Sequence, residues 1–175
     1  DVPIGTAVYT PMLNSRGGYE ADVTVSRTGD AAFLMVSSAA TTVRDLDWLR
    51  RHAPAGTAWQ VDDVSDDWAV IGVMGPRSRD LLSSCSSDDL SDNVFPFGTS
   101  QEIRLAGVIV RATRITYVGE LGWEVYVPSG DAQAVYAALT AAGEAFGARP
   151  AGYYAIDALR LEKGYRAFAR ELTPD

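Results

Sequence analysis

The sequence predicts an α+β fold in which pairs of β-strands alternate with α-helices. Short segments of alternating or apolar residues occur in pairs, and turns rich in glycine or aspartate join the members of each pair. Segments with helical spacing of apolar residues follow these strand pairs. This order occurs twice along the 175 residues without a short tandem repeat, and it is typical of the α+β class.

Three strands are expected near the start of the chain, at residues 9–13, 22–27 and 32–36. The residues at 14–18 read Asn-Ser-Arg-Gly-Gly, a turn in which two glycines are free to adopt a positive φ. Residues 22–27 alternate between polar and apolar side chains, as a half-buried strand does. A further glycine turn follows, so the later two strands are predicted to form an antiparallel hairpin.

A helix and another strand pair are predicted next. Thr41 or Thr42 can cap a helix that ends near His52, and arginines lie at its C-terminal end, where a helix favours positive charge. The strand pair is expected at residues 57–64 and 68–74, joined by an acidic turn.

A second helix is expected at residues 75–85, because its early proline is well tolerated at the first helical position. A Ser- and Asp-rich segment at residues 83–92 then marks the predicted domain boundary. We therefore expect a first subdomain at residues 1–85 and a second α+β subdomain at residues 86–175.

The second half is predicted to repeat this order. Strands are expected at residues 102–105 and 108–117, around an Ala-Gly turn, and a hairpin follows them. An alanine-rich helix is expected at residues 131–146, and another at residues 153–163 that Gly164 ends.

Composition excludes several classes of protein. The formal net charge of −8 argues against a nucleic-acid surface, because phosphate binding requires clustered lysine and arginine. The sequence has no run of about 18 apolar residues, so no membrane span is expected. Cys85 is the only cysteine, so an internal disulfide cannot form. A reducing, cytoplasmic location is the expectation. The chain begins at Asp1 without methionine and ends on a polar turn, so we expect a fragment of a longer polypeptide.

Residues 117–124, with the sequence Tyr-Val-Gly-Glu-Leu-Gly-Trp-Glu, have two interpretations. In the first they form a hairpin, with the glycines in the turn and Glu120 and Trp123 at the surface. In the second they bind a flat heterocycle, because an aromatic face can stack on it and a carboxylate can accept a pair of N–H donors. These residues alone leave both interpretations open.

Two carboxylates are the main candidates for chemistry. Asp22 follows the glycine turn and is either a solvated strand-end residue or a base beside a developing cation, with Glu20 as its competitor. Glu124 precedes an apolar strand, where a carboxylate is costly to bury unless it is paired. Glu120 is expected only to support the turn.

Arg160 has two interpretations as well. It either forms an ion pair with Asp157, one helical turn before it, or recognises a carboxylate on a ligand tail. His52 is the only histidine and is expected to be exposed, so a Ser-His-Asp hydrolase is not expected. No glycine-rich phosphate loop is present, so any flavin or nucleotide site is expected outside this chain.

Three segments together carry a family resemblance. They are residues 12–22 (MLNSRGGYEAD), 115–124 (ITYVGELGWE) and 153–165 (YYAIDALRLEKGY). The chain resembles the folate-binding aminomethyltransferase domain, the T-protein of the glycine cleavage system. Residues 95–98 (FPFG) and 171–175 (ELTPD) favour one branch, the C-terminal half of the flavin-dependent dimethylglycine and sarcosine dehydrogenases and oxidases.

The resemblance implies one-carbon chemistry. In this family a flavin part oxidises an N-methyl amine to an iminium, and tetrahydrofolate captures the one-carbon unit as 5,10-methylenetetrahydrofolate. Asp22 matches the catalytic aspartate. Glu124 matches the carboxylate that binds the pterin edge, and Tyr117 matches the aromatic beside it. Arg160 is implied to be a supporting or tail-binding residue. The implied partners are the folate and a flavin domain of the same polypeptide, with FAD in the missing N-terminal part.

The chain departs from the family pattern in two ways. Many T-proteins have two adjacent aspartates where this chain has Ala21 and Asp22, and a terminal β-barrel expected in the family is missing here. An alternative is a non-catalytic regulatory or folate-fold module of a larger complex. One such branch, which repairs iron–sulfur clusters, carries Lys-Gly-Cys where this chain reads Lys-Gly-Tyr at residues 163–165, which argues against that branch.

Overall fold

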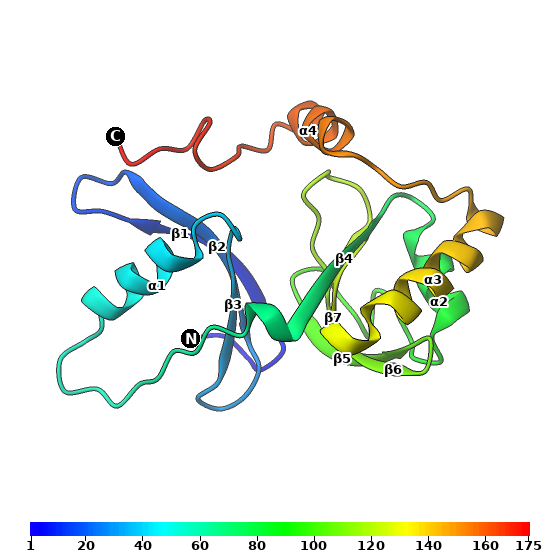
Figure 1. Ribbon diagram of the computed structural model, residues 1–175, viewed down its shortest axis with the longest axis horizontal. Coiled ribbons are helices and arrows are strands. Elements are labelled where there is room, and N and C mark those ends of the chain that lie inside the picture. The colour runs from blue at the N-terminus through cyan, green and yellow to red at the C-terminus, as the bar shows by residue number, and fades with distance from the viewer.

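The computed structural model describes residues 1–175 and contains two antiparallel sheets that lie side by side (Figure 1). Helix α4 (Tyr153–Glu162) and the C-terminal segment, residues 163–175, run across both sheets. Helices occupy the outer sides of the sheets. The predicted α+β class is confirmed. No helix combines the length and the apolar character that crossing a bilayer requires.

The first sheet has the strand order β1-β2-β3. Its strands are β1 (Ala7–Leu13), β2 (Tyr19–Arg27) and β3 (Phe33–Val36). The predicted glycine turn joins β1 to β2, and Gly17 adopts a φ of 86° there. Helix α1 (Thr42–Arg51) is tied to β2 by an ion pair between Arg44 and Glu20.

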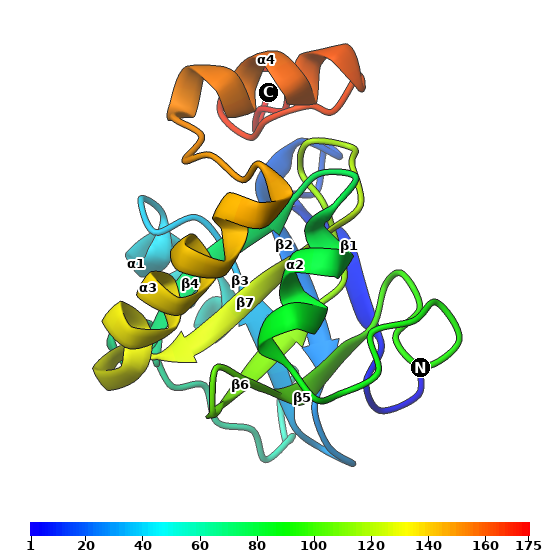
Figure 2. The ribbon, with the colours of Figure 1, turned by 90° about the vertical axis from the view of Figure 1, so that its right-hand side faces the viewer.

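The second sheet has the strand order β4-β7-β6-β5. Its strands are β4 (Trp68–Met74), β5 (Ser100–Leu105), β6 (Val108–Thr113) and β7 (Gly122–Pro128). Helices α2 (Ser78–Cys85) and α3 (Ala132–Gly143) cover one face of this sheet (Figure 2). The short 3-10 turns next to these elements are η1 (Ser65–Asp67), η2 (Ser129–Asp131) and η3 (Glu144–Phe146).

Strand β7 separates the core of the second sheet from a polar face. Successive side chains on a strand point to opposite sides of the sheet. Trp123, Val125 and Val127 are fully buried in the cluster that α2 and α3 cover. Glu124 and Tyr126 therefore lie on the opposite face of β7, where the sequence had predicted a carboxylate that needs a partner.

One predicted strand is wrong. Residues 57–64 form no strand, and only Val61 among them is half-buried. The predicted hairpin partner, β4, pairs instead with β7 from the second half of the chain. Two adjacent aspartates also make this segment a poor strand. The alternation of polar and apolar residues did not reveal that β4 pairs with β7, a strand far away in the sequence.

Other boundaries shift by a few residues. Strand β6 ends at Thr113, so the predicted strand at 108–117 is too long, and β5 begins slightly earlier than predicted. Helix α2 starts at Ser78, after a turn at Gly75 with a φ of 131°. Helix α4 (Tyr153–Glu162) and its glycine stop agree with the prediction.

The two sheets do not divide the chain at the predicted boundary. Strand β4 and helix α2 precede residue 86, but they pack on β7 and α3, which follow it. The change from one sheet to the other falls between β3 and β4. The division into residues 1–85 and 86–175 remains a prediction that the arrangement of the sheets does not require.

Candidate functional site

Glu124 is held at the middle of the second sheet. It lies between Gly72 of β4 and Thr113 of β6, and its side chain is half-buried on the polar face. Its Oε2 atom accepts a hydrogen bond from the hydroxyl of Tyr126 at 2.6 Å. The predicted carboxylate at the base of an apolar strand is therefore partnered, as burial requires.

Sequence reasoning missed Tyr126. The side chain is 4% exposed, and burial, followed by the charge and hydrogen bond of Glu124, raises the pKa of its phenol. The signal that reveals this partner is the two-residue spacing, because residues i and i+2 of a strand share a face.

The segment 117–124 is not a tight hairpin. A loop from residue 114 to residue 121 connects β6 to β7, and Gly119 has a φ of 76° in it. Gly122 begins β7, where a Cβ would lie 2.7 Å from the Cγ of Met74, so only glycine permits this approach. The hairpin interpretation placed Trp123 at the surface, and this is wrong. Trp123 is fully buried because it points to the helix-covered side of β7.

Tyr117 and Glu124 line the same cavity. The cavity has a volume of about 890 Å³ and runs along β4, beside α3, α4 and the segment that leads into α4. Its apolar lining includes Val70, Val118 and Ile156. A carboxylate among apolar walls can bind a flat ligand through its polar edge while the walls contact its faces. The structure thus brings together two of the predicted ligand-binding residues.

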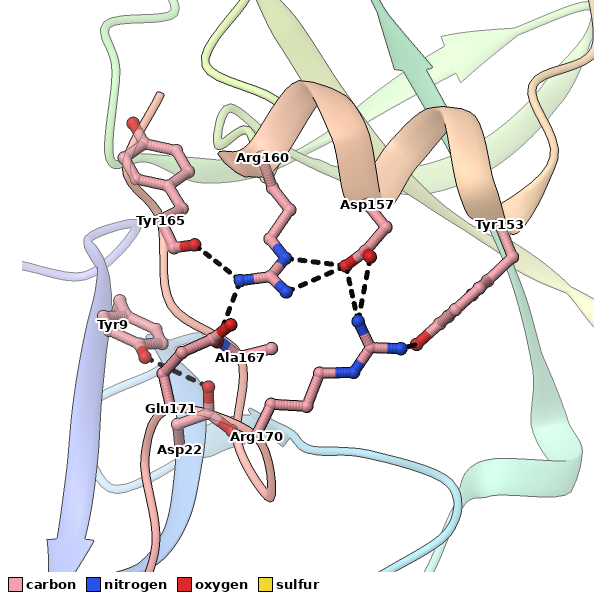
Figure 3. Close-up of polar contacts among 9 residues, drawn as sticks. All are labelled: Tyr9, Asp22, Tyr153, Asp157, Arg160, Tyr165, Ala167, Arg170 and Glu171. Carbon is pink, nitrogen blue, oxygen red and sulfur yellow. Dashed lines mark hydrogen bonds and ion pairs between the residues drawn. The ribbon is translucent and has the colours of Figure 1, made fainter. Parts of the chain in front are cut away.

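Asp22 lies on β2 and is half-buried. Its Oδ2 atom accepts a hydrogen bond from the Tyr9 hydroxyl of β1 at 3.0 Å (Figure 3). Burial, followed by the charge of Asp22, raises the pKa of the Tyr9 phenol, so the phenol keeps its proton and remains a donor. The competing candidate Glu20 is occupied by Asn14 and Arg44. The structure therefore favours Asp22 of the two carboxylates.

Arg160 is buried and ion-paired in this structure. It is 1% exposed, and its guanidinium forms ion pairs at 2.9 Å with Asp157 and with Glu171 and donates to the backbone oxygen of Tyr165 (Figure 3). Arg170 also pairs with Asp157. These bonds hold α4 to the C-terminal segment and leave the guanidinium buried, which favours the predicted supporting role over recognition of a ligand tail.

Tyr117 lies close to charged groups of both the first sheet and helix α4. Burial is the main cause that raises the pKa of its phenol; the charge of Arg160 opposes this rise, and those of Asp157, Glu171 and Asp22 add to it. Such effects require the charges to lie close by. Tyr117 thus lines the cavity of Glu124 and also lies within the electrostatic reach of Asp22.

Comparison with known proteins identifies the family of the chain. A family model described as the GCVT N-terminal domain matches residues 1–175. The chain belongs to the GCVT N-terminal domain family. This confirms the resemblance on which the roles of Asp22 and Glu124 were predicted, although those roles themselves remain predictions.

Proteins similar to the chain include longer enzymes. The mitochondrial sarcosine dehydrogenase of Mus musculus is 42% identical over 99% of the chain. The mitochondrial dimethylglycine dehydrogenase of Homo sapiens is 36% identical over 98% of it. The chain spans about a fifth of the length of these dehydrogenases: 20% in each case. Both relatives are mitochondrial, so they do not support the predicted cytoplasmic location of this chain, which stays a prediction.

A solved structure shows the same fold. The aminomethyltransferase T of the glycine cleavage system from Bartonella henselae superposes with a TM-score of 0.85 at 27% identity. The match covers 99% of this chain and 45% of that one. The chain is therefore an aminomethyltransferase-like domain related to sarcosine and dimethylglycine dehydrogenases.

Proposed function

We propose that this domain binds tetrahydrofolate and captures on it the one-carbon unit released when an N-methyl amine is oxidised, giving 5,10-methylenetetrahydrofolate. The observation that carries the proposal is the shared cavity of Tyr117 and Glu124, in which the carboxylate is fixed by a hydrogen bond. The relatives named for oxidising sarcosine and dimethylglycine support the amine class.

The residues of the cavity fit a pterin. One edge of a pterin presents two neighbouring N–H donors, an arrangement that matches the two oxygens of one carboxylate. Glu124 would accept these bonds, and the ring of Tyr117 would lie beside the heterocycle. The apolar lining would exclude water and so strengthen the hydrogen bonds.

Asp22 would perform the chemical role. Two folate nitrogens would each form a bond to the one-carbon unit and lose a proton, while the bond between that unit and the amine breaks. One proton would leave with the released amine, and Asp22 would accept the other. Its negative charge would also stabilise the cationic iminium before the bond forms. Tyr9 would orient the carboxylate through the 3.0 Å hydrogen bond. Arg160 would keep α4 in place.

The oxidation belongs to another part of the full-length protein. We propose that FAD is bound there and accepts the electrons of the N-methyl amine. This chain would then supply only folate binding, proton transfer and exclusion of water.

A comparison of Asp22→Ala with the unchanged full-length protein tests the proposal. Tetrahydrofolate affinity should be mostly retained, because Asp22 does not bind the pterin edge, while the formation of methylenetetrahydrofolate should fall and free formaldehyde should rise. A non-catalytic regulatory module would show the same product distribution in both proteins. That result would overturn the proposed transfer.

A further inference from the structure

Buried hydroxyl groups lie on the same face of the second sheet as Glu124. Ser100 of β5 and Thr113 of β6 are register partners, and their hydroxyl oxygens lie 2.9 Å apart. Thr113 is also the register partner of Glu124 on β7. Tyr126, two residues after Glu124 on the same face, donates a hydrogen bond to Glu124 at 2.6 Å. Ser100, Thr113 and Tyr126 are each at most 4% exposed, so these hydroxyl groups are enclosed by the protein.

The hydrogen bond from Tyr126 leaves part of the Glu124 carboxylate free to accept other bonds. A carboxylate has two oxygens with about four positions that can accept hydrogen bonds. Tyr126 occupies one position on Oε2, so Oε1 and the remaining position on Oε2 stay available. A ligand edge with two neighbouring N–H groups needs one acceptor on each oxygen. The arrangement is therefore compatible with a bidentate ligand.

The hydrogen bond from Tyr126 also limits the motion of Glu124. A glutamate side chain loses conformational freedom when its carboxylate is ordered, and this loss costs free energy. A tyrosine that is 4% exposed is confined by the packing around it, and a hydrogen bond from it fixes the orientation of the carboxylate before a ligand arrives. Less ordering is then required on binding.

We infer that Tyr126 is a positioning residue that presets the Glu124 carboxylate for a ligand edge with two adjacent N–H donors. The inference rests on the proposed function and adds a residue to its binding site. Tyr126 has no direct contact with the ligand in this account. All of its effect on binding passes through Glu124.

A double-mutant cycle in the full-length protein tests this inference. The variants are Tyr126→Phe, Glu124→Gln and the two combined, and the probe is 5-formyltetrahydrofolate, measured by calorimetric titration. Tyr126→Phe should weaken binding about tenfold, the scale of one hydrogen bond to a charged group. In the Glu124→Gln background the same change should alter affinity by less than about twofold.

The control variant is Tyr154→Phe, because the Tyr154 side chain is 88% exposed and its hydroxyl has no hydrogen-bond partner. This variant should leave affinity unchanged. Equal losses from Tyr126→Phe in both backgrounds would overturn the inference, since a general structural defect acts without Glu124. No loss in either background would also overturn it. An unchanged affinity in Glu124→Gln alone would instead refute the proposed function.

A second variant covers the case in which Tyr126→Phe does not fold. Thr113→Val nearly keeps the volume of the side chain but removes the hydroxyl that bonds to Ser100 and that lowers the pKa of the neighbouring Tyr126 phenol. The donor then loses a polar neighbour but stays in place. Affinity should fall about two- to threefold, and this loss should disappear in the Glu124→Gln background. A loss of the same size in that background would contradict the inference.

Discussion

Arg160 and Glu171 form an ion pair in which Nη1 and Oε2 are 2.9 Å apart, and this pair joins helix α4 to the C-terminal segment. The same segment continues to the turn between β1 and β2, where Asn14 donates a hydrogen bond to the backbone oxygen of Pro174 at 2.9 Å. Through these contacts, residues at the end of the chain link α4 to the first sheet. Figure 3 shows the first of them, the pair of Arg160 and Glu171.

We predict that Arg160→Gln lowers the free energy of unfolding. The variant removes the cation that lies between Asp157 and Glu171 and leaves the two carboxylates near each other without its charge. Urea unfolding measures the change. The control is Arg51→Gln, because the ion pair of Arg51 with Asp47 is exposed and its loss should have almost no effect. Equal stability of the two variants would contradict the assignment of Arg160 as a structural residue.

The contribution of Arg160 should also depend on pH. Hydrogen bonds from Arg160 are the main cause that lowers the pKa of Asp157 and of Glu171 below their ordinary values of 3.8 and 4.5. A group with a lowered pKa in the folded state stabilises the fold above its unfolded pKa and loses this effect as pH falls. The stability difference between the protein and Arg160→Gln should be full at pH 7 and shrink below about pH 4. A constant difference between pH 7 and pH 3 would refute this.

Gly18→Ala should displace the C-terminal segment from the β1–β2 turn. A Cβ at this position would lie 2.0 Å from the backbone oxygen of Pro174, so one of the two segments must move. The Tyr19 amide donates to the oxygen of Thr173 at 2.8 Å, and its hydrogen exchange should accelerate in the variant. The control Gly130→Ala adds a Cβ that meets no atom within 4 Å. Unchanged protection of Tyr19 in Gly18→Ala would show that the contact does not form.

Local sequence patterns predicted the elements whose signals are local. The glycine turn at residues 14–18, helix α4 and its stop at Gly164 follow from turn chemistry, helical spacing and the φ that glycine permits. The false strand at residues 57–64 shows the limit of this reasoning. Whether a segment pairs depends on a partner, and β7 was the better partner for β4.

The candidate site was predicted only in part, because its residues also depend on partners that local patterns do not reveal. Glu124 and Asp22 could be singled out because a carboxylate at a strand end or beside an apolar strand is unusual. Their donors, Tyr126 and Tyr9, come from strand faces and strand pairing, which single positions in the sequence do not display. The burial of Arg160 depends on Glu171, from a segment with no regular helix or strand.

The most direct test of the central claim is calorimetric titration of the full-length protein and its Glu124→Ala variant with a reduced folate. The variant should bind more weakly by roughly 2–4 kcal/mol, because the pterin N–H groups lose their acceptor in a partly enclosed cavity. Glu120→Ala, at an exposed position on the preceding loop, should bind like the unchanged protein. Unchanged folate affinity in Glu124→Ala would contradict the account.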